Sequence, residues 1–141
     1  MTDTRADYAA LLLRVTMGAL FVAHGFYLKV FVFTMPGTVG FFESIGFPGF
    51  LAWVVMLAET LGGVALILGV LTRWVALALI PVMLGALSVH IGNGWVFSAQ
   101  GGGWEYPVFW TVALVVQALL GDGAYALKLP GLNAPRTAQT T

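Results

Sequence analysis

The chain is 141 residues long, which suits one domain rather than two. Apolar residues of the set AVILMFWYC make up 60% of it and charged residues only 9%, whereas soluble domains carry about 25% charged residues. This charged fraction is too small to cover a surface exposed to water. The composition therefore indicates an integral membrane protein embedded in a lipid bilayer. The net charge of 0 excludes nucleic acid as a partner, because nucleic-acid binding depends on a basic surface.

The N-terminal residues 1–10 do not match a removable signal peptide. Arg5 is offset by Asp3 and Asp7, and the apolar run that follows is interrupted by Arg14. We therefore expect the first apolar run to remain in the membrane.

Four apolar runs approach or exceed the roughly 20 residues that an α-helix needs to cross a bilayer. They predict an all-α membrane protein, a four-helix bundle with transmembrane helices over about residues 8–30, 49–70, 74–92 and 104–121. Residues 1–128 form a single domain in this prediction, and residues 129–141 form a flexible tail that is poor in apolar side chains.

The connections between the runs differ in character. Met35-Pro36-Gly37 predicts a turn, and residues 38–45 predict a short amphipathic segment that lies in the membrane interface between the first two spans. The connection Leu71-Thr72-Arg73 is so short that the second and third spans must form an antiparallel hairpin.

The basic residues predict the orientation in the membrane. Four spans place both termini on one side, and five of the six basic residues lie on that side. These five residues are Arg5, Arg14, Arg73, Lys128 and Arg136, and only Lys29 lies on the other side. By the positive-inside rule, we expect both termini to be cytoplasmic in a multi-pass protein of the cell (inner) membrane.

Ionisable residues within an apolar bundle are candidates for a functional site, because a charge at the centre of a span costs several kcal/mol. The candidates for a polar intramembrane site are Arg14, His24, Lys29, Glu59, His90 and Glu105. His24 and His90 each lie 16 residues from the cytoplasmic end of their spans, a depth of about 24 Å at 1.5 Å per residue. Glu59 lies near the middle of the membrane.

Helical periodicity predicts which faces of the spans point inward. One stripe consists of Arg14, Gly18, Phe21, Gly25 and Lys29, and the face of Glu59 holds Ala52, Gly62, Gly63 and Leu66. Small residues in these stripes indicate close contact between helices.

Each candidate also has a purely structural interpretation. Arg14 and Lys29 can extend to opposite interfaces, and Glu105 can stabilise the start of a helix. His24 and His90 can be neutral packing residues. A purely structural interpretation is least convincing for Glu59. Its expected ion-pair partner is Arg14, whose side chain is long enough to reach it.

No metal site is predicted, because no His-x-x-His or Glu-x-x-His spacing is present. The chain also contains no cysteine, which excludes iron–sulfur clusters and thiol redox centres. A redox role would therefore require a bound cofactor or a protein partner.

Several short motifs in a fixed order resemble the DoxX family over about residues 10–128. They are Arg14, His24-Gly25 with Lys29, Glu59-x-x-Gly62-Gly63, residues 69–73, His90 with Asn93-Gly94, and residues 103–107. The family consists of small four-helix membrane proteins of bacteria and archaea and is named after a subunit of a quinone-linked thiosulfate-oxidising enzyme. The resemblance implies a membrane partner of redox or sulfur-transfer enzymes in oxidative-stress defence. This chain departs from many relatives in having Ala126 and Lys128 after Tyr125.

The leading hypothesis is a component of a quinone-linked membrane oxidoreductase that works with a redox protein partner. Its site would be bounded by Arg14, His24, Glu59 and His90, with the two histidines binding quinone. A haem between the histidines would give the same geometry. A non-enzymatic scaffold and a small proton-coupled transporter are the alternatives, and the sequence leaves open whether the protein is an enzyme, what its substrate is and whether it forms homo-oligomers.

Overall fold

The computed structural model describes residues 4–130, and the regular secondary structure in this part of the chain is helical, with no strand. In chain order, the elements are α1 (Thr4–Val22), η1 (Ala23–Val32), α2 (Met35–Ser44), α3 (Phe50–Leu68), α4 (Thr72–His90), η2 (Ile91–Asn93) and α5 (Glu105–Leu120). The prediction of an all-α protein is confirmed. Residues 131–141 of the predicted tail (129–141) lie outside the described residues, as do residues 1–3.

Each predicted span coincides with a helix. The π-helical segment η1 continues α1, so the first helical rod runs over 29 residues from Thr4 to Val32. This rod, α3 and the rod formed by α4 and η2 are long and apolar enough to cross a membrane. The helix α5 is also apolar but has only 16 residues.

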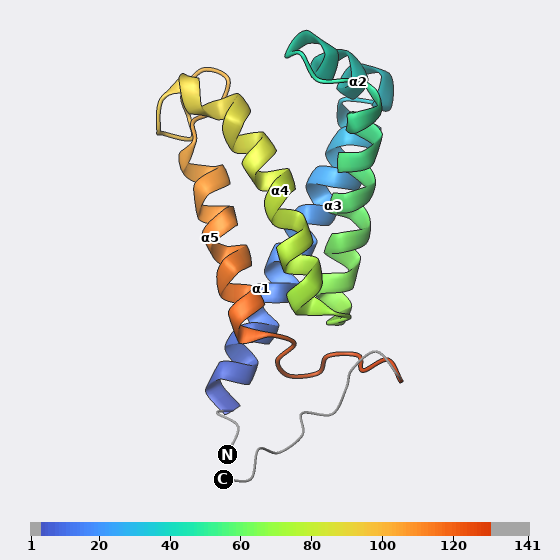
Figure 1. The fold of residues 1–141 in the computed structure, drawn as a ribbon, viewed down its shortest axis with the longest axis vertical. Helices are drawn as coiled ribbons and strands as arrows, with labels where there is room; N and C mark the ends of the chain where they lie inside the picture. Colours follow the sequence, from blue (N-terminus) through green and yellow to red (C-terminus); the bar gives the residue numbers. More distant parts are fainter. Residues whose placement is uncertain (1–3, 131–141) are drawn as a thin grey trace.

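The helices form two arms that diverge toward one end (Figure 1). One arm holds η1, α2 and the first half of α3, and the other holds α4 and α5 (Figure 1). We call the end where the arms diverge the loop end, because it carries α2 and the loop of residues 94–104. The opposite end, which carries the α3–α4 turn, is the hairpin end.

The turn between α3 and α4 confirms the predicted antiparallel hairpin. Gly69 ends α3 in the left-handed conformation with φ of 74°, which a glycine adopts without steric cost. Leu71 precedes α4 and is also left-handed, with φ of 48°. Two consecutive helices therefore reverse direction within three residues.

The core lies between α1, α3, α4 and α5 near the middle of the bundle. Its apolar members include Met17, Phe21, Leu66, Leu79 and Leu114, all of which are buried. The predicted inward stripe of the first span is confirmed, because Arg14, Gly18, Phe21 and Gly25 are all buried. The face of Glu59 is likewise buried at Ala52, Gly63 and Leu66.

Residues 121–127 form an irregular segment that crosses the hairpin end, and we call this segment the terminal strap. Ala124 donates its N–H to the carbonyl of Asp7 at 3.0 Å, and Leu127 donates to the carbonyl of Leu68 at 3.0 Å. The side chain of Asp122 accepts a hydrogen bond from the N–H of Thr72 at 3.2 Å, at the start of α4. The terminal strap therefore joins α1, α3 and α4 at this end.

The prediction that Met35-Pro36-Gly37 forms a turn is wrong, because these residues are the first turn of α2. Thr34 caps this helix by accepting a hydrogen bond from the N–H of Gly37. Proline is compatible with the first turn of a helix because the N–H that it lacks would have no partner there. The same residue that suggests a turn therefore starts a helix here.

Candidate functional site

Lys29 and Glu59 form a salt bridge between η1 and α3. The Nζ of Lys29 lies 2.5 Å from Oε2 of Glu59, and the two side chains are only 16% and 9% exposed. A pair of charges shielded from water in this way costs free energy to desolvate, and it remains stable only when each charge compensates the other. This salt bridge therefore pairs two opposite charges within the apolar part of the bundle.

His24 lies beside this ion pair. The Nζ of Lys29 donates a second hydrogen bond to the carbonyl of His24 at 3.2 Å. The imidazole is close enough to interact electrostatically with the carboxylate of Glu59. It also packs edge to face against the ring of Trp110 in α5, with ring centroids 5.1 Å apart. We call His24, Lys29 and Glu59 the polar cluster.

Local sequence explains why the polar cluster forms. A Cβ atom on Gly25 would lie 2.7 Å from the Cβ of Glu59, so only glycine lets α3 approach η1 this closely. The segment from Ala23 to Val32 is π-helical, a rare conformation that is frequent at functional sites. It carries both His24 and Lys29, and the absence of a side chain at Gly25 brings Glu59 against them.

The expected ion pair between Arg14 and Glu59 is not formed. Arg14 is 1% exposed and donates to the carbonyls of Leu66 and Ile67 at the end of α3, at 3.1 and 2.5 Å. It also donates to two carbonyls of the terminal strap, those of Asp122 at 2.9 Å and Ala124 at 2.7 Å. The fork of guanidinium donors thus satisfies backbone oxygens at the hairpin end, away from the polar cluster.

His90 and Glu105 have separate roles in the loop at the other end of the bundle. His90 hydrogen-bonds through Nδ1 to the carbonyls of Gly101 and Gly102, at 3.0 and 3.2 Å. Glu105, in the first turn of α5, accepts a hydrogen bond from the N–H of Phe97 at 3.1 Å. In residues 4–130, the two histidines share no hydrogen-bond partner and no ring contact, so their equal predicted depth does not place them in one cluster.

The structure adds two residues that the sequence did not single out. Trp110 carries the ring against which His24 packs, and it also contacts Phe21 with ring centroids 4.9 Å apart. A tryptophan inside an apolar span is expected to contribute to packing, so its position alone gave no signal. Asp122 caps α4 and holds Arg14 through its carbonyl, and only its place after the glycine at the end of the last span could have indicated a capping role.

No group of three or more His, Asp or Glu side chains within residues 4–130 is arranged to hold a metal ion. The polar cluster contains one imidazole, one ammonium and one carboxylate. These groups can exchange protons and form hydrogen bonds with an aromatic ligand that carries oxygen atoms.

The fold and the polar cluster together define a small helical membrane protein with an ion pair between its first two long helices. A family model described as DoxX matches residues 9–92, so the chain belongs to the DoxX family. This result confirms the family that the motifs indicated. The matched region contains the whole polar cluster and ends within η2.

Among curated proteins, "Putative oxidoreductase CatD" of Bacillus subtilis (strain 168) is 41% identical to this chain over 81 residues. The alignment covers 57% of this chain and 58% of that relative, so the chain spans somewhat more than half the length of the relative. No solved structure matches the chain significantly.

Proposed function

We propose that this protein is the membrane component of a quinone-linked oxidoreductase and that the polar cluster is its quinone site. The observation that carries this proposal is the salt bridge of Lys29 and Glu59 beside His24 within helices that are otherwise apolar. Ionisable residues within a membrane span are costly and are kept mainly at sites of proton or ligand transfer. The name of the Bacillus relative, which describes an oxidoreductase, supports the same class of activity.

The residues of the polar cluster fit a quinone chemically. A quinone requires hydrogen-bonding groups for its ring oxygens and an exchange of two protons for every two electrons. The cluster supplies an ammonium, an imidazole and a carboxylate, and Trp110 and Phe21 supply aromatic surface. In this chain, His24 and Glu59 would hold and pass the protons, and Lys29 would hold the carboxylate in place.

The electrons require a second protein. The chain has no cysteine, and its own side chains provide no redox centre, so a soluble redox protein would donate or accept the two electrons. Such a partner would bind at one membrane surface. Sulfur-transfer and oxidative-stress enzymes are the class of partner that the family resemblance implies.

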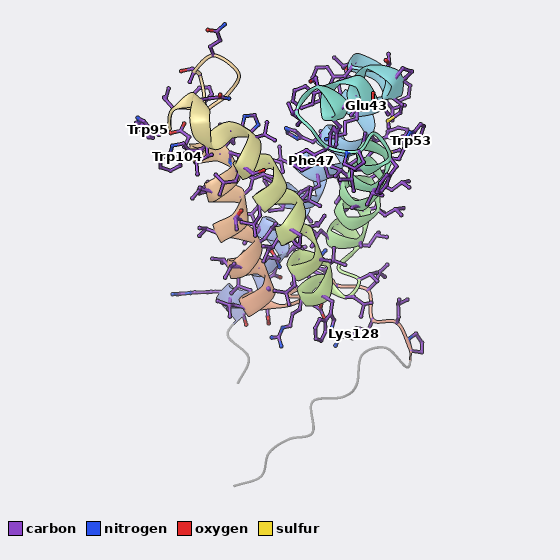
Figure 2. All side chains as sticks on the ribbon, turned by 45° about the horizontal axis from the view of Figure 1, so that its top comes forward. Glu43, Phe47, Trp53, Trp95, Trp104 and Lys128 are labelled. Carbon is purple, nitrogen blue, oxygen red and sulfur yellow. The ribbon has the colours of Figure 1, made fainter. Side chains whose placement is uncertain are left out.

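In the membrane, α5 would be the fourth span, and α2 would lie in the interface at the loop end. Exposed aromatic rings gather near the loop end, among them Trp53 on one arm and Trp95 and Trp104 on the other (Figure 2). Tryptophan is typical of the boundary between lipid and water. Lys128 lies at the opposite end (Figure 2), so the hairpin end would face the cytoplasm of the cell.

Binding of a short-chain alkyl benzoquinone to the full chain in lipid nanodiscs tests the proposal. We expect saturable binding to the wild type. For the reduced form of the same ligand, the benzoquinol, we expect His24→Ala to lose about tenfold in affinity, because the imidazole nitrogen that accepts a hydrogen bond from a ring hydroxyl is removed. His90→Ala is the matched control, since His90 hydrogen-bonds the loop of residues 94–104 and not the polar cluster. Equal affinities of the wild type and His24→Ala, or no binding at all, would contradict the proposed site.

A further inference from the structure

The hydrogen bond of His24 determines which of its ring nitrogens carries the proton. Its Nδ1 lies 2.8 Å from the carbonyl oxygen of Leu20. A carbonyl oxygen can only accept a hydrogen bond, so Nδ1 must carry the proton and donate it. In the neutral imidazole, Nε2 then presents a lone pair, and it has no partner among the described residues.

Glu59 presents a second acceptor, on the neighbouring helix α3. Its Oε2 accepts from Lys29, whereas no hydrogen bond within residues 4–130 reaches Oε1. A carboxylate oxygen in an apolar bundle is expensive to leave without a donor. The polar cluster therefore carries two acceptor atoms that require a hydrogen from outside the cluster.

Two side chains at or next to the polar cluster can donate hydrogen bonds, and one of them already donates to other groups. Lys29 already donates to Glu59 and to the carbonyl of His24, which leaves one of its three N–H groups. The indole N–H of Trp110 makes no hydrogen bond to the part of the chain that the structure describes. A ligand at the polar cluster would thus meet both unpaired acceptors and unpaired donors.

The unpaired acceptors and donors at the polar cluster interact differently with the oxidised form of the ligand, quinone, and the reduced form, quinol. The carbonyl oxygens of the oxidised form can only accept, so they would face the lone pairs of Nε2 and Oε1 without a hydrogen between them. The hydroxyls of the reduced form donate to those lone pairs and can still accept from Lys29 or Trp110. The ring of His24 is exposed on the helix surface, so a ligand from the bilayer can reach its Nε2, and an acceptor left unpaired in an apolar environment is unfavourable.

We propose that the polar cluster selects the reduced form, so that this protein binds quinol more tightly than quinone. This inference rests on the proposed function and names the form of the ligand that the site takes. The selectivity depends on His24 and Glu59 together, since each contributes one unpaired acceptor.

The test compares one alkyl benzoquinone with its chemically reduced quinol, each titrated anaerobically into the full chain in nanodiscs. We expect the quinol to bind about tenfold more tightly to the wild type. His24→Phe keeps a ring against Trp110 but removes the acceptor. The ratio of the affinities for quinol and quinone should therefore fall toward one. His90→Phe is the matched control and should keep the preference of the wild type.

Glu59→Gln provides an independent readout, because the amide replaces a pure acceptor by a group that also donates. The affinity for the oxidised form should rise relative to that for the quinol. Equal or tighter binding of the oxidised form by the wild type would overturn the inference but leave the proposed quinone site intact. Absence of binding by both forms would instead contradict the proposed function itself.

Discussion

Gly18 of α1 and Gly63 of α3 face each other at the crossing of the two helices, each close to the backbone of the other. A Cβ atom on Gly18 would lie 2.5 Å from the carbonyl oxygen of Gly63, and one on Gly63 would lie 2.7 Å from that of Gly18. Because lipid does not drive helices together as water does, such close backbone contact is a main source of stability in membranes. The contact also fixes the distance between η1 and α3 at the polar cluster.

Gly18→Ala should destabilise the protein by about 1 to 3 kcal/mol, because the new methyl group collides with the backbone of α3. The measurement is reversible unfolding in detergent. Gly85→Ala is the matched control in α4, where a Cβ would meet no atom within 4 Å, and it should leave stability unchanged or raise it slightly. Equal effects of the two substitutions would mean that the α1–α3 crossing is not tightly packed.

Arg14→Met should cost about 3 kcal/mol or more, because four carbonyl oxygens lose their donor at once. Arg14→Lys should recover only a small part, since a single ammonium cannot reproduce the planar fork. The exposed Arg73, which donates to the carbonyl of Ala118, serves as the control. Unfolding of Arg73→Met in detergent should show a loss of about 1 kcal/mol at most, and a comparable loss for both arginines would argue against the special role of Arg14.

Glu59→Gln should destabilise the protein by about 2 to 4 kcal/mol, because Lys29 keeps its charge and loses its counter-ion. The double variant Lys29→Met with Glu59→Leu should be markedly more stable than Glu59→Gln alone, since no charge then remains unpaired. Unfolding of the single and double variants forms a mutant cycle that measures the coupling directly. If the effects add strictly, the two side chains do not stabilise each other.

Reporter fusions test the orientation in the membrane. A fusion at Thr141 should be active only with a cytoplasmic reporter, and a fusion within the loop near Gly101 only with a periplasmic one, because five of six basic residues lie on the side of the termini. A periplasmic signal from Thr141 would reverse the predicted topology.

The sequence predicts the positions of the helices well because the thickness of the membrane sets their length. It also predicts the inward stripe of Gly18, Phe21 and Gly25, since helical periodicity and side-chain size are local properties. The partner of Glu59 was not predictable in the same way. Lys29 rather than Arg14 pairs with Glu59 because a π-helical segment carries Lys29, and because Arg14 donates to carbonyl oxygens of residues more than 100 positions away.

The pair of histidines shows a related limit. Depth follows from residue counting, whereas the direction of a side chain also depends on the rotation of each helix and on the loops. His24 turns toward Trp110, and His90 turns toward the loop at Gly101 and Gly102. Equal depth was therefore compatible with entirely different surroundings.

The hydrogen bonds of Arg14 impose an order on biosynthesis. Arg14 is separated by 108 and 110 residues from Asp122 and Ala124, whose carbonyls it binds. A ribosome completes the first helix before it makes any of the four acceptors of Arg14, and two of the four are still missing when α3 is complete. The protein can reach its final structure only after residues 122–124 have been made. A chain that stopped before residue 122 would leave two hydrogen bonds of the guanidinium unformed, a defect for quality-control proteases to detect.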